Sequence, residues 1–266
     1  MYDLPALDSA LAGTAFAGKL HFSPTTGSTN SDASTAARSG APHGSVYLAD
    51  EQTAGRGRGN HGWHSAAGEG LYVSVLLRLP IPPARLPLLP LAAGLAAAGA
   101  IHAAAGLAVD LRWPNDLLFN SRISGPRKTG GILAETGNDS AELPYAVAGI
   151  GINVHQRAFP PDLATLATSL DLETGRHISR QSLLVALLKF LERETTALAD
   201  PAAASTILQR VEQASTWIRG RSVQVHGPQA CQGVTAGLDE NGFLRVITPA
   251  GVVTVQTGGL RATGEN

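Results

Sequence analysis

The chain has 266 residues and a formal net charge of −1, with 44% hydrophobic and only 15% charged residues. This balance excludes a disordered chain and gives no long-range positive field that would draw the whole protein to nucleic acid or to an anionic membrane. The single cysteine, Cys231, excludes an intramolecular disulfide framework and a multi-cysteine zinc site. Residues 1–20 lack the pattern of a signal peptide. We therefore expect a globular, cytoplasmic protein.

Hydrophobic periodicity predicts a central sheet in the first 155 residues. The segment Thr29-Asn30-Ser31-Asp32 has the form of a capping box, which predicts a helix over residues 33–38 that stops at Gly40. From Leu71 to Leu79 every second residue is apolar, as in a strand with one buried face. Strands are predicted over residues 46–49, 71–79, 107–113, 130–136 and 145–154.

One uncharged segment is long enough to cross a bilayer. No charged residue occurs from Leu86 to Val109. Its prolines, its glycines, His102 and its alanine-dominated composition give it weak hydrophobicity, which argues against a membrane span. We expect a buried, alanine-rich helix that begins near Pro90.

The second half of the chain changes character near Ile218. Leucine spacing predicts an amphipathic helix over residues 181–198 with Ser179 as its cap, and a second helix over residues 206–218. Several short apolar runs follow, separated by turns that include an Asn241-Gly242 hairpin signal. We expect a main domain of residues 1–218 and a small barrel of residues 219–266.

A glycine-rich loop directly precedes the strand at residue 71. Six glycines between Gly55 and Gly70 expose backbone N–H groups, and Arg56 and Arg58 add positive charge, which suits a polyphosphate or an acyl phosphate. A dinucleotide-binding fingerprint needs a helix after its glycines, and a strand follows here. The alternative is a solvated surface loop. His61 and His64 lack a third ligand at a suitable spacing, so we expect no metal held by the protein.

Other polar residues have a structural and a functional interpretation. Residues 28–30 either cap a helix or bind the polar head of a ligand, and three residues supply more groups than one cap uses. Asn115 and Asp116, after Pro114, are turn residues or site residues. Lys128 is solvated or lies along a phosphate.

Two glycines interrupt the most apolar of the predicted strands. Gly149 and Gly151 lie in the segment that ends at Asn153. Because glycine destabilises the interior of a strand, its presence twice indicates that another backbone or a ligand approaches closely.

Taken in series, these segments resemble the successive motifs of biotin protein ligases. The resemblance implies an α+β fold, with a mixed sheet and flanking helices like those of class II synthetases and lipoate ligases, followed by an SH3-like barrel. The motifs are residues 28–30, 51–58, Trp63, 112–117, 128–135 and 149–154.

The resemblance implies an ATP-dependent ligase. Such enzymes join biotin to ATP, giving biotinyl-5′-AMP and pyrophosphate, and then pass biotin to a lysine of a biotin carboxyl carrier domain. Mg²⁺ is expected with the ATP phosphates. The biotin carboxylate is ionised at neutral pH, so the first step needs no general base. It needs relief of the repulsion between two anions and in-line placement.

The resemblance also implies the site residues. Lys128, Arg58, Arg56 and Asp116 would be catalytic, with Asp116 orienting or deprotonating the incoming lysine. The biotin site would comprise Ser28, Thr29, Asn30, Gln52, Gly55, Arg56, Gly57, Arg58, Lys128, Gly131, Leu133, Gly149 and Gly151. The ATP site would comprise Arg58, Trp63, Asn115, Lys128 and Asn153. Biotin and ATP should order the glycine-rich loop as a lid.

The chain departs from the family pattern in its loop, where residues 59–61 replace part of a basic run. Members that also repress transcription carry an N-terminal DNA-binding domain, for which there is no room before Ser28. We therefore expect no DNA binding and no repressor activity. A homodimer is one option that the sequence leaves open. The rival interpretations are a lipoyl or octanoyl transferase on the same fold and a non-catalytic biotin- or nucleotide-sensing module.

Overall fold

The computed structural model describes residues 2–59, 61–121, 125–164 and 166–263. Within them, seven strands form a mixed sheet in the order β1-β2-β3-β7-β6-β5-β4, in which β1 and β2 run parallel and the other neighbours run antiparallel. This sheet confirms the predicted α+β class. The strands are β1 (Leu20–Thr26), β2 (Val46–Gln52), β3 (Gly70–Leu77), β4 (Asp110–Arg112), β5 (Asp116–Ser121), β6 (Gly125–Asn138) and β7 (Pro144–Asn153).

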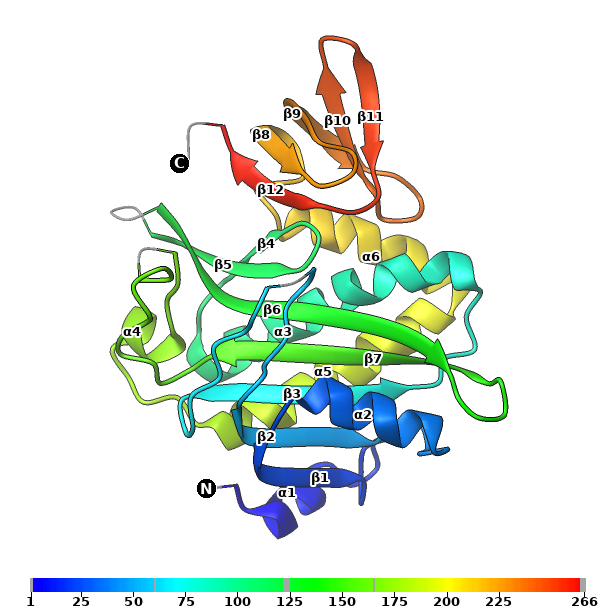
Figure 1. The fold of residues 1–266 in the computed structure, drawn as a ribbon, viewed down its shortest axis with the longest axis vertical. Helices are drawn as coiled ribbons and strands as arrows, with labels where there is room; N and C mark the ends of the chain where they lie inside the picture. The colour runs from blue at the N-terminus through cyan, green and yellow to red at the C-terminus, as the bar shows by residue number, and fades with distance from the viewer. Residues whose placement is uncertain (1, 60, 122–124, 165, 264–266) are drawn as a thin grey trace.

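Helices cover both faces of this sheet. Helix α2 lies on one face, and α3 and α5 lie on the other (Figure 1). The remaining helical segments lie at the ends and edges of the sheet or lead into the C-terminal strands. The helices are α1 (Leu4–Ala10), α2 (Thr29–Arg38), η1 (Pro83–Leu88), α3 (Leu89–Ala105), α4 (Leu170–Thr174), α5 (Arg180–Ala199) and α6 (Pro201–Gln213).

Successive side chains of β3 point to opposite faces of the sheet, and this alternation explains why helices pack on both faces. Its odd-numbered residues from Leu71 to Leu77 pack in the main core beneath α3 and α5. On the opposite face, Leu76 joins Ala33 and Ala37 of α2 in a small second cluster. Tyr72 and Ser74 lie on that same face and are buried, but they line a cavity instead of packing in this cluster.

The segment Pro83–Ala105, comprising η1 and α3, is the described helical stretch that is long and apolar enough to cross a membrane, with a mean hydropathy of 1.7. Most of it is buried against the sheet and α5. Pro90 occupies its first turn, where a proline costs no hydrogen bond. The structure therefore confirms the predicted buried helix.

The C-terminal strands form an antiparallel five-stranded sheet in the order β11-β10-β9-β8-β12. Their inward residues, including Val223 and Val225, join the same core cluster as Trp217 and Ile218. The core is thus continuous across residue 218, and the division of the chain there stays a prediction. The strands are β8 (Arg219–His226), β9 (Cys231–Leu238), β10 (Leu244–Thr248), β11 (Gly251–Val255) and β12 (Gly259–Ala262).

The structure differs from the predicted elements at several places. Helix α1 and strand β1 were not predicted. Helix α6 begins at Pro201 rather than at residue 206, because the Asp200 side chain accepts a hydrogen bond from the Ala202 amide and proline tolerates the first helical turn. Only residues 110–112 of the predicted strand 107–113 pair, and Asp116, after the turn that follows this strand, begins a further strand, β5.

A buried carboxylate joins α5 to α6. The Glu194 side chain is fully buried and accepts hydrogen bonds from Arg210 at 2.6 and 2.8 Å and from Arg193 at 2.8 and 3.1 Å. Burial alone would raise the pKa of Glu194, but the two guanidinium groups outweigh it and hold the pKa below its ordinary value. The ion pair between Glu194 and Arg210 joins α5 to α6, the helices that lead into the C-terminal sheet.

We expect Glu194→Gln to lower the free energy of unfolding at pH 7 by about 1–2 kcal/mol, because charge-assisted hydrogen bonds to a buried group are weakened while Arg193 and Arg210, 61% and 35% exposed, keep their contact with water. A depressed native pKa stabilises the fold above the unfolded pKa of about 4.3, and this contribution is lost as pH falls through the native pKa. The difference between variant and wild type should therefore shrink below about pH 4. Urea unfolding followed by circular dichroism measures it. The exposed Glu240→Gln is the control, and equal stability of wild type and Glu194→Gln at pH 7 would contradict the prediction.

Candidate functional site

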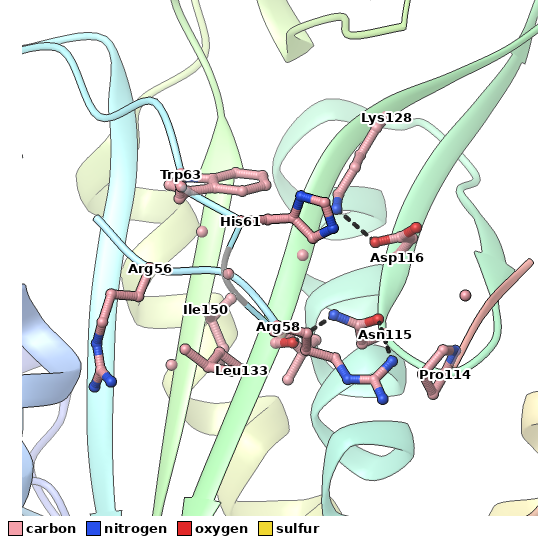
Figure 2. Close-up of a pocket in the computed structure, with 18 of the residues that line it drawn as sticks. Arg56, Arg58, His61, Trp63, Pro114, Asn115, Asp116, Lys128, Leu133 and Ile150 are labelled. Carbon is pink, nitrogen blue, oxygen red and sulfur yellow. Dashed lines mark hydrogen bonds and ion pairs between the residues drawn. The ribbon is translucent and has the colours of Figure 1, made fainter. Parts of the chain in front are cut away.

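A cavity of about 540 Å³ lies on the face of the sheet that carries α2. Its walls come from β3, β6 and β7, from the glycine-rich loop, from the β4–β5 turn and from the C-terminal sheet (Figure 2). The predicted residues that line it are Ser28, Thr29, Asn30, Gln52, Arg56, Gly57, Arg58, Trp63, Asn115, Asp116, Lys128, Gly131, Leu133, Gly149 and Gly151.

One end of the cavity is a hydrogen-bonded polar cluster. Thr29 Oγ1 lies 2.7 Å from Ser74 Oγ, and Gln52 Oε1 accepts bonds from the Thr29 amide at 2.9 Å and hydroxyl at 3.1 Å. Ser74 also donates to the Asn30 side chain. These residues come from α2, β2 and β3, so three elements fix the cluster.

Ser28 differs from its neighbours. It is the N-cap residue of α2 and only 5% exposed, yet its side chain makes no capping bond. Among the described residues, no hydrogen-bond partner of its hydroxyl is found. A buried hydroxyl at the wall of a cavity is a group that a ligand can satisfy.

Two glycines of β7 form the floor. A Cβ atom at Gly149 would lie 2.0 Å from Asn30 Oδ1, and one at Gly151 would lie 2.6 Å from the Trp63 ring. The side chains of Asn30 and Trp63 therefore rest directly on the strand. The sequence predicted the approach of another backbone or of a ligand, whereas the groups found there are side chains. Within the described part of the chain, the buried Trp63 Nε1 has no hydrogen-bond partner.

The other end of the cavity is cationic. Lys128 Nζ lies 2.6 Å from Asp116 Oδ1, and Arg112 Nη2 lies 2.8 Å from Asp116 Oδ2. The lysine also lies over the Trp63 ring, 5.3 Å from its centre. Burial alone would raise the pKa of Asp116, but Lys128 and Arg112 outweigh it and hold the pKa below its usual range. Asp116 is therefore ionised at neutral pH and positions both cations.

The two loop arginines have different surroundings. Arg58 donates to the Gly258 carbonyl at 2.8 Å and to Thr257 Oγ1 at 2.9 Å, and it lies 3.5 Å from Asn115 Oδ1. Burial lowers its pKa and Asp116 opposes that shift, but a guanidinium remains charged. Arg56 forms a two-pronged ion pair with Glu135 at 2.6 and 2.9 Å and points away from the Lys128–Asp116 pair (Figure 2).

The glycine-rich loop folds into a small hairpin above the cavity. The Gly57 amide donates to the His61 carbonyl at 2.8 Å, and the Trp63 amide donates to the Gly55 carbonyl at 2.9 Å. His61 extends over the cavity near Asp116 (Figure 2). Asn60, part of the departure from the family pattern, lies outside the described residues.

Two predicted site residues do not line the cavity. Gly55 is the first residue of the loop and packs against its returning segment, where a Cβ atom would lie 2.5 Å from the Trp63 carbonyl oxygen. Asn153 is buried at the end of β7, where its amide donates to the Thr168 carbonyl at 3.1 Å. Asn153 therefore holds the segment after β7 instead of facing the cavity.

Sequence reasoning missed several lining residues. Ser74 is a polar residue in an otherwise apolar, fully buried strand, and this exception was the available signal. Arg112 belongs to the family motif of residues 112–117, but the sequence analysis predicted no function for its side chain. The C-terminal sheet also supplies lining residues, and no sequence pattern around them indicated a binding site. They are His226, Gly227, Pro228 and Thr257 to Arg261.

The family model of the biotin/lipoate A/B protein ligase family matches residues 23–153. A biotin--[acetyl-CoA-carboxylase] ligase of Mycobacterium tuberculosis is 34% identical over 241 residues, which are 88% of this chain and 85% of that protein. A bifunctional ligase/repressor BirA of Bacillus spizizenii is 40% identical over 168 residues, or 62% of this chain. The matched part spans about half the length of that relative.

Solved structures give the same result. A biotin protein ligase from Aquifex aeolicus, in complex with biotin and ATP, superposes with a TM-score of 0.78 and 28% identity, covering 92% of this chain and 98% of that one. Both its sequence relatives and its fold therefore place the chain in the biotin protein ligase family.

Proposed function

We propose that the chain is an ATP-dependent biotin protein ligase. It would join biotin to ATP, giving biotinyl-5′-AMP and pyrophosphate, and then transfer biotin to a lysine of a biotin carboxyl carrier domain. The observation that carries the proposal is a single cavity with a hydrogen-bonding end at Thr29 and Ser74 and a cationic end at Lys128. Biotin has the matching shape, a polar ring at one end and a carboxylate at the other. Relatives in the family are named as ligases of this kind.

The polar cluster would bind the ureido ring. Ser28 would supply its unused hydroxyl there, and the apolar part of biotin would lie in the cavity between Leu133 and the Trp63 side chain, which the absence of a Cβ at Gly151 lets sit close to β7. The carboxylate then points to Lys128. A lipoyl or octanoyl chain ends in no comparable polar group, so it would leave this cluster without partners. The polar cluster therefore favours biotin over an acyl chain.

The first step joins two anions. A carboxylate oxygen of biotin forms a bond to the α-phosphorus of ATP while the bond from that phosphorus to pyrophosphate breaks. Lys128 and Arg58 both line the cavity. Lys128 would neutralise the carboxylate and the α-phosphate, and Arg58 would hold the phosphates. Charges that are already in position lower the barrier because little rearrangement is needed as the reaction proceeds.

The nucleotide would lie towards the C-terminal sheet. Trp63 and Asn115 line this part of the cavity and would contact the nucleotide there. Asp116 is the carboxylate among the described lining residues, and its oxygens are engaged by Lys128 and Arg112. The described lining residues therefore offer no unpaired carboxylate for Mg²⁺, so the ion would enter with the ATP phosphates.

In the second step the neutral amine of the acceptor lysine attacks the acyl carbon, the bond from that carbon to the phosphate oxygen breaks, and AMP leaves with its electron pair. The proton that the nitrogen loses passes to solvent water. The amine must be neutral to attack. Because Asp116 is stabilised as a carboxylate by two cations, we assign it the positioning of Lys128 rather than the removal of this proton. Cytoplasmic location, a carboxylase carrier domain as partner, the lack of DNA binding and a homodimer stay predictions.

We expect Ser28→Ala to weaken biotin binding about fivefold, the value of one hydrogen bond worth about 1 kcal/mol. The thermal midpoint of the empty protein should stay unchanged because the hydroxyl makes no capping bond. Isothermal titration calorimetry with biotin measures the affinity, and the exposed Ser39→Ala is the matched control. Wild-type affinity in Ser28→Ala would remove Ser28 from the biotin site.

We expect Lys128→Ala to slow adenylate formation by about 10²-fold or more while biotin binding stays measurable, because the lysine acts mainly on charge that develops in the transition state. Mass spectrometry of biotinyl-5′-AMP and a pyrophosphate release assay follow the reaction. Lys189→Ala, an exposed change on α5, should react like wild type. Unchanged turnover in Lys128→Ala would contradict the electrostatic assignment.

We expect biotin with ATP and Mg²⁺ to slow tryptic cleavage after Arg56 and Arg58, because a ligand beneath the glycine-rich loop adds contacts that hold it closed. Cleavage after the exposed Arg157 provides the internal control. Peptide mapping over time measures both rates. Equal loop cleavage with and without ligands would exclude a lid.

A further inference from the structure

A cluster of metal-ligand side chains lies outside the cavity. His155 follows β7, Asp171 lies in α4, and His177 lies just beyond the C-cap of that helix at Gly175. His155 Nδ1 is 2.9 Å and His177 Nδ1 is 3.3 Å from the same oxygen, Asp171 Oδ2. One ligand atom from each residue lies within 4.8 Å of the others. None of the three lines the cavity.

The spacing suits a transition metal. Nitrogen and oxygen ligands about 2.0–2.1 Å from a tetrahedral Zn²⁺ lie about 3.4 Å from one another. The two contacts to Asp171 Oδ2 are within about 0.5 Å of that separation. The imidazole rings of His155 and His177 lie 4.1 Å apart and nearly parallel, at 12°, so both nitrogens face the same carboxylate. Because stacked rings direct their lone pairs side by side, the two rings have to tilt towards each other to bind one ion, and the exposed His177 side chain is free to make this movement.

The surroundings allow a metal to enter. The His177 side chain is 79% exposed, whereas those of His155 and Asp171 are 16% and 19% exposed. The exposed side leaves room for a water molecule as fourth ligand. The Ile178 amide donates to Asp171 Oδ1 at 2.9 Å, which orients the carboxylate and leaves Oδ2 for the ion, as outer hydrogen bonds commonly do at metal sites.

We propose that His155, Asp171 and His177 form a site for one divalent transition-metal ion of the Zn²⁺ class. The two histidines and one carboxylate are nitrogen and oxygen ligands that Zn²⁺ accepts, and each histidine binds through the lone pair of its Nδ1 atom. An ion there ties the end of β7 to the residue beyond α4. The ion would join the two ends of the segment of residues 155–177, as a cross-link would.

The segment of residues 155–177 is hydrogen-bonded to the main chain of Lys128. The Lys128 amide donates to the Leu166 carbonyl at 2.7 Å, and the Thr168 amide donates to the Lys128 carbonyl at 3.0 Å. The Asp171 amide in turn donates to the Val154 carbonyl at 2.9 Å. The ion would therefore stabilise the segment that supports Lys128, although no ligand atom touches the cavity.

The test is titration of Zn²⁺ into the full chain after removal of bound metal with a chelator. We expect one ion per chain, an increase in the thermal midpoint, and an affinity at least tenfold lower in His177→Ala. This variant should fold normally because His177 is exposed and bonds to Asp171 alone among the described residues. His102→Ala, an exposed histidine in α3, should bind as wild type does.

A spectroscopic readout separates this site from weak surface binding. Co²⁺ in place of Zn²⁺ should give the intense visible absorption of a low-coordinate nitrogen site, and this absorption should be lost in His177→Ala and in Asp171→Asn. Equal Zn²⁺ affinity in wild type and His177→Ala would overturn the proposal. So would a Co²⁺ spectrum that matches the hydrated ion. Neither measurement involves biotin or ATP, so the result is independent of the proposed ligase activity.

Discussion

The central constraint on this protein is that β3, β6 and β7 are covered on both faces while one face must also leave space for a ligand. The alternation of side chains along a strand meets both needs. One set of residues, such as Val73 and Ile150, packs beneath α3 and α5. The opposite set is small or polar where the cavity lies, as at Ser74 and Gly151. A shift of one residue in register would place polar groups in the core, so the pairing that builds the core also builds the site.

Charge is distributed locally rather than over the whole molecule. The chain has a formal net charge of −1, yet the described lining holds five cationic side chains and Asp116 as its carboxylate, the cations being Arg56, Arg58, Arg112, Lys128 and Arg261. Such a cavity attracts anions at short range without drawing the protein to every polyanion. Asp116 keeps two of these cations in place, which limits the rearrangement needed when phosphates arrive.

The sequence was sufficient for the features that follow from local periodicity. The strand at residue 71, the buried helix near Pro90 and the Ser179 cap all occur in the structure. Features that depend on pairing between distant segments were not predictable. Lys128 meets Asp116 because β5 and β6 shift register between Leu117 and Leu118, and no spacing rule gives that irregularity. The histidine cluster likewise requires α4, a five-residue helix with no clear sequence signal.

The position of Arg58 explains why the C-terminal sheet belongs to the site. Two of its donors already bind Thr257 and Gly258, which lie 199 and 200 residues further along the chain. A guanidinium has five N–H donors, so the group can keep these contacts and still offer donors to a phosphate. The Trp113 indole adds a second link, donating to the Gly242 carbonyl at 3.0 Å. Any movement of the glycine-rich loop therefore has to break the contacts of Arg58 with Thr257 and Gly258 or carry them along, which makes the C-terminal sheet an anchor of the proposed lid.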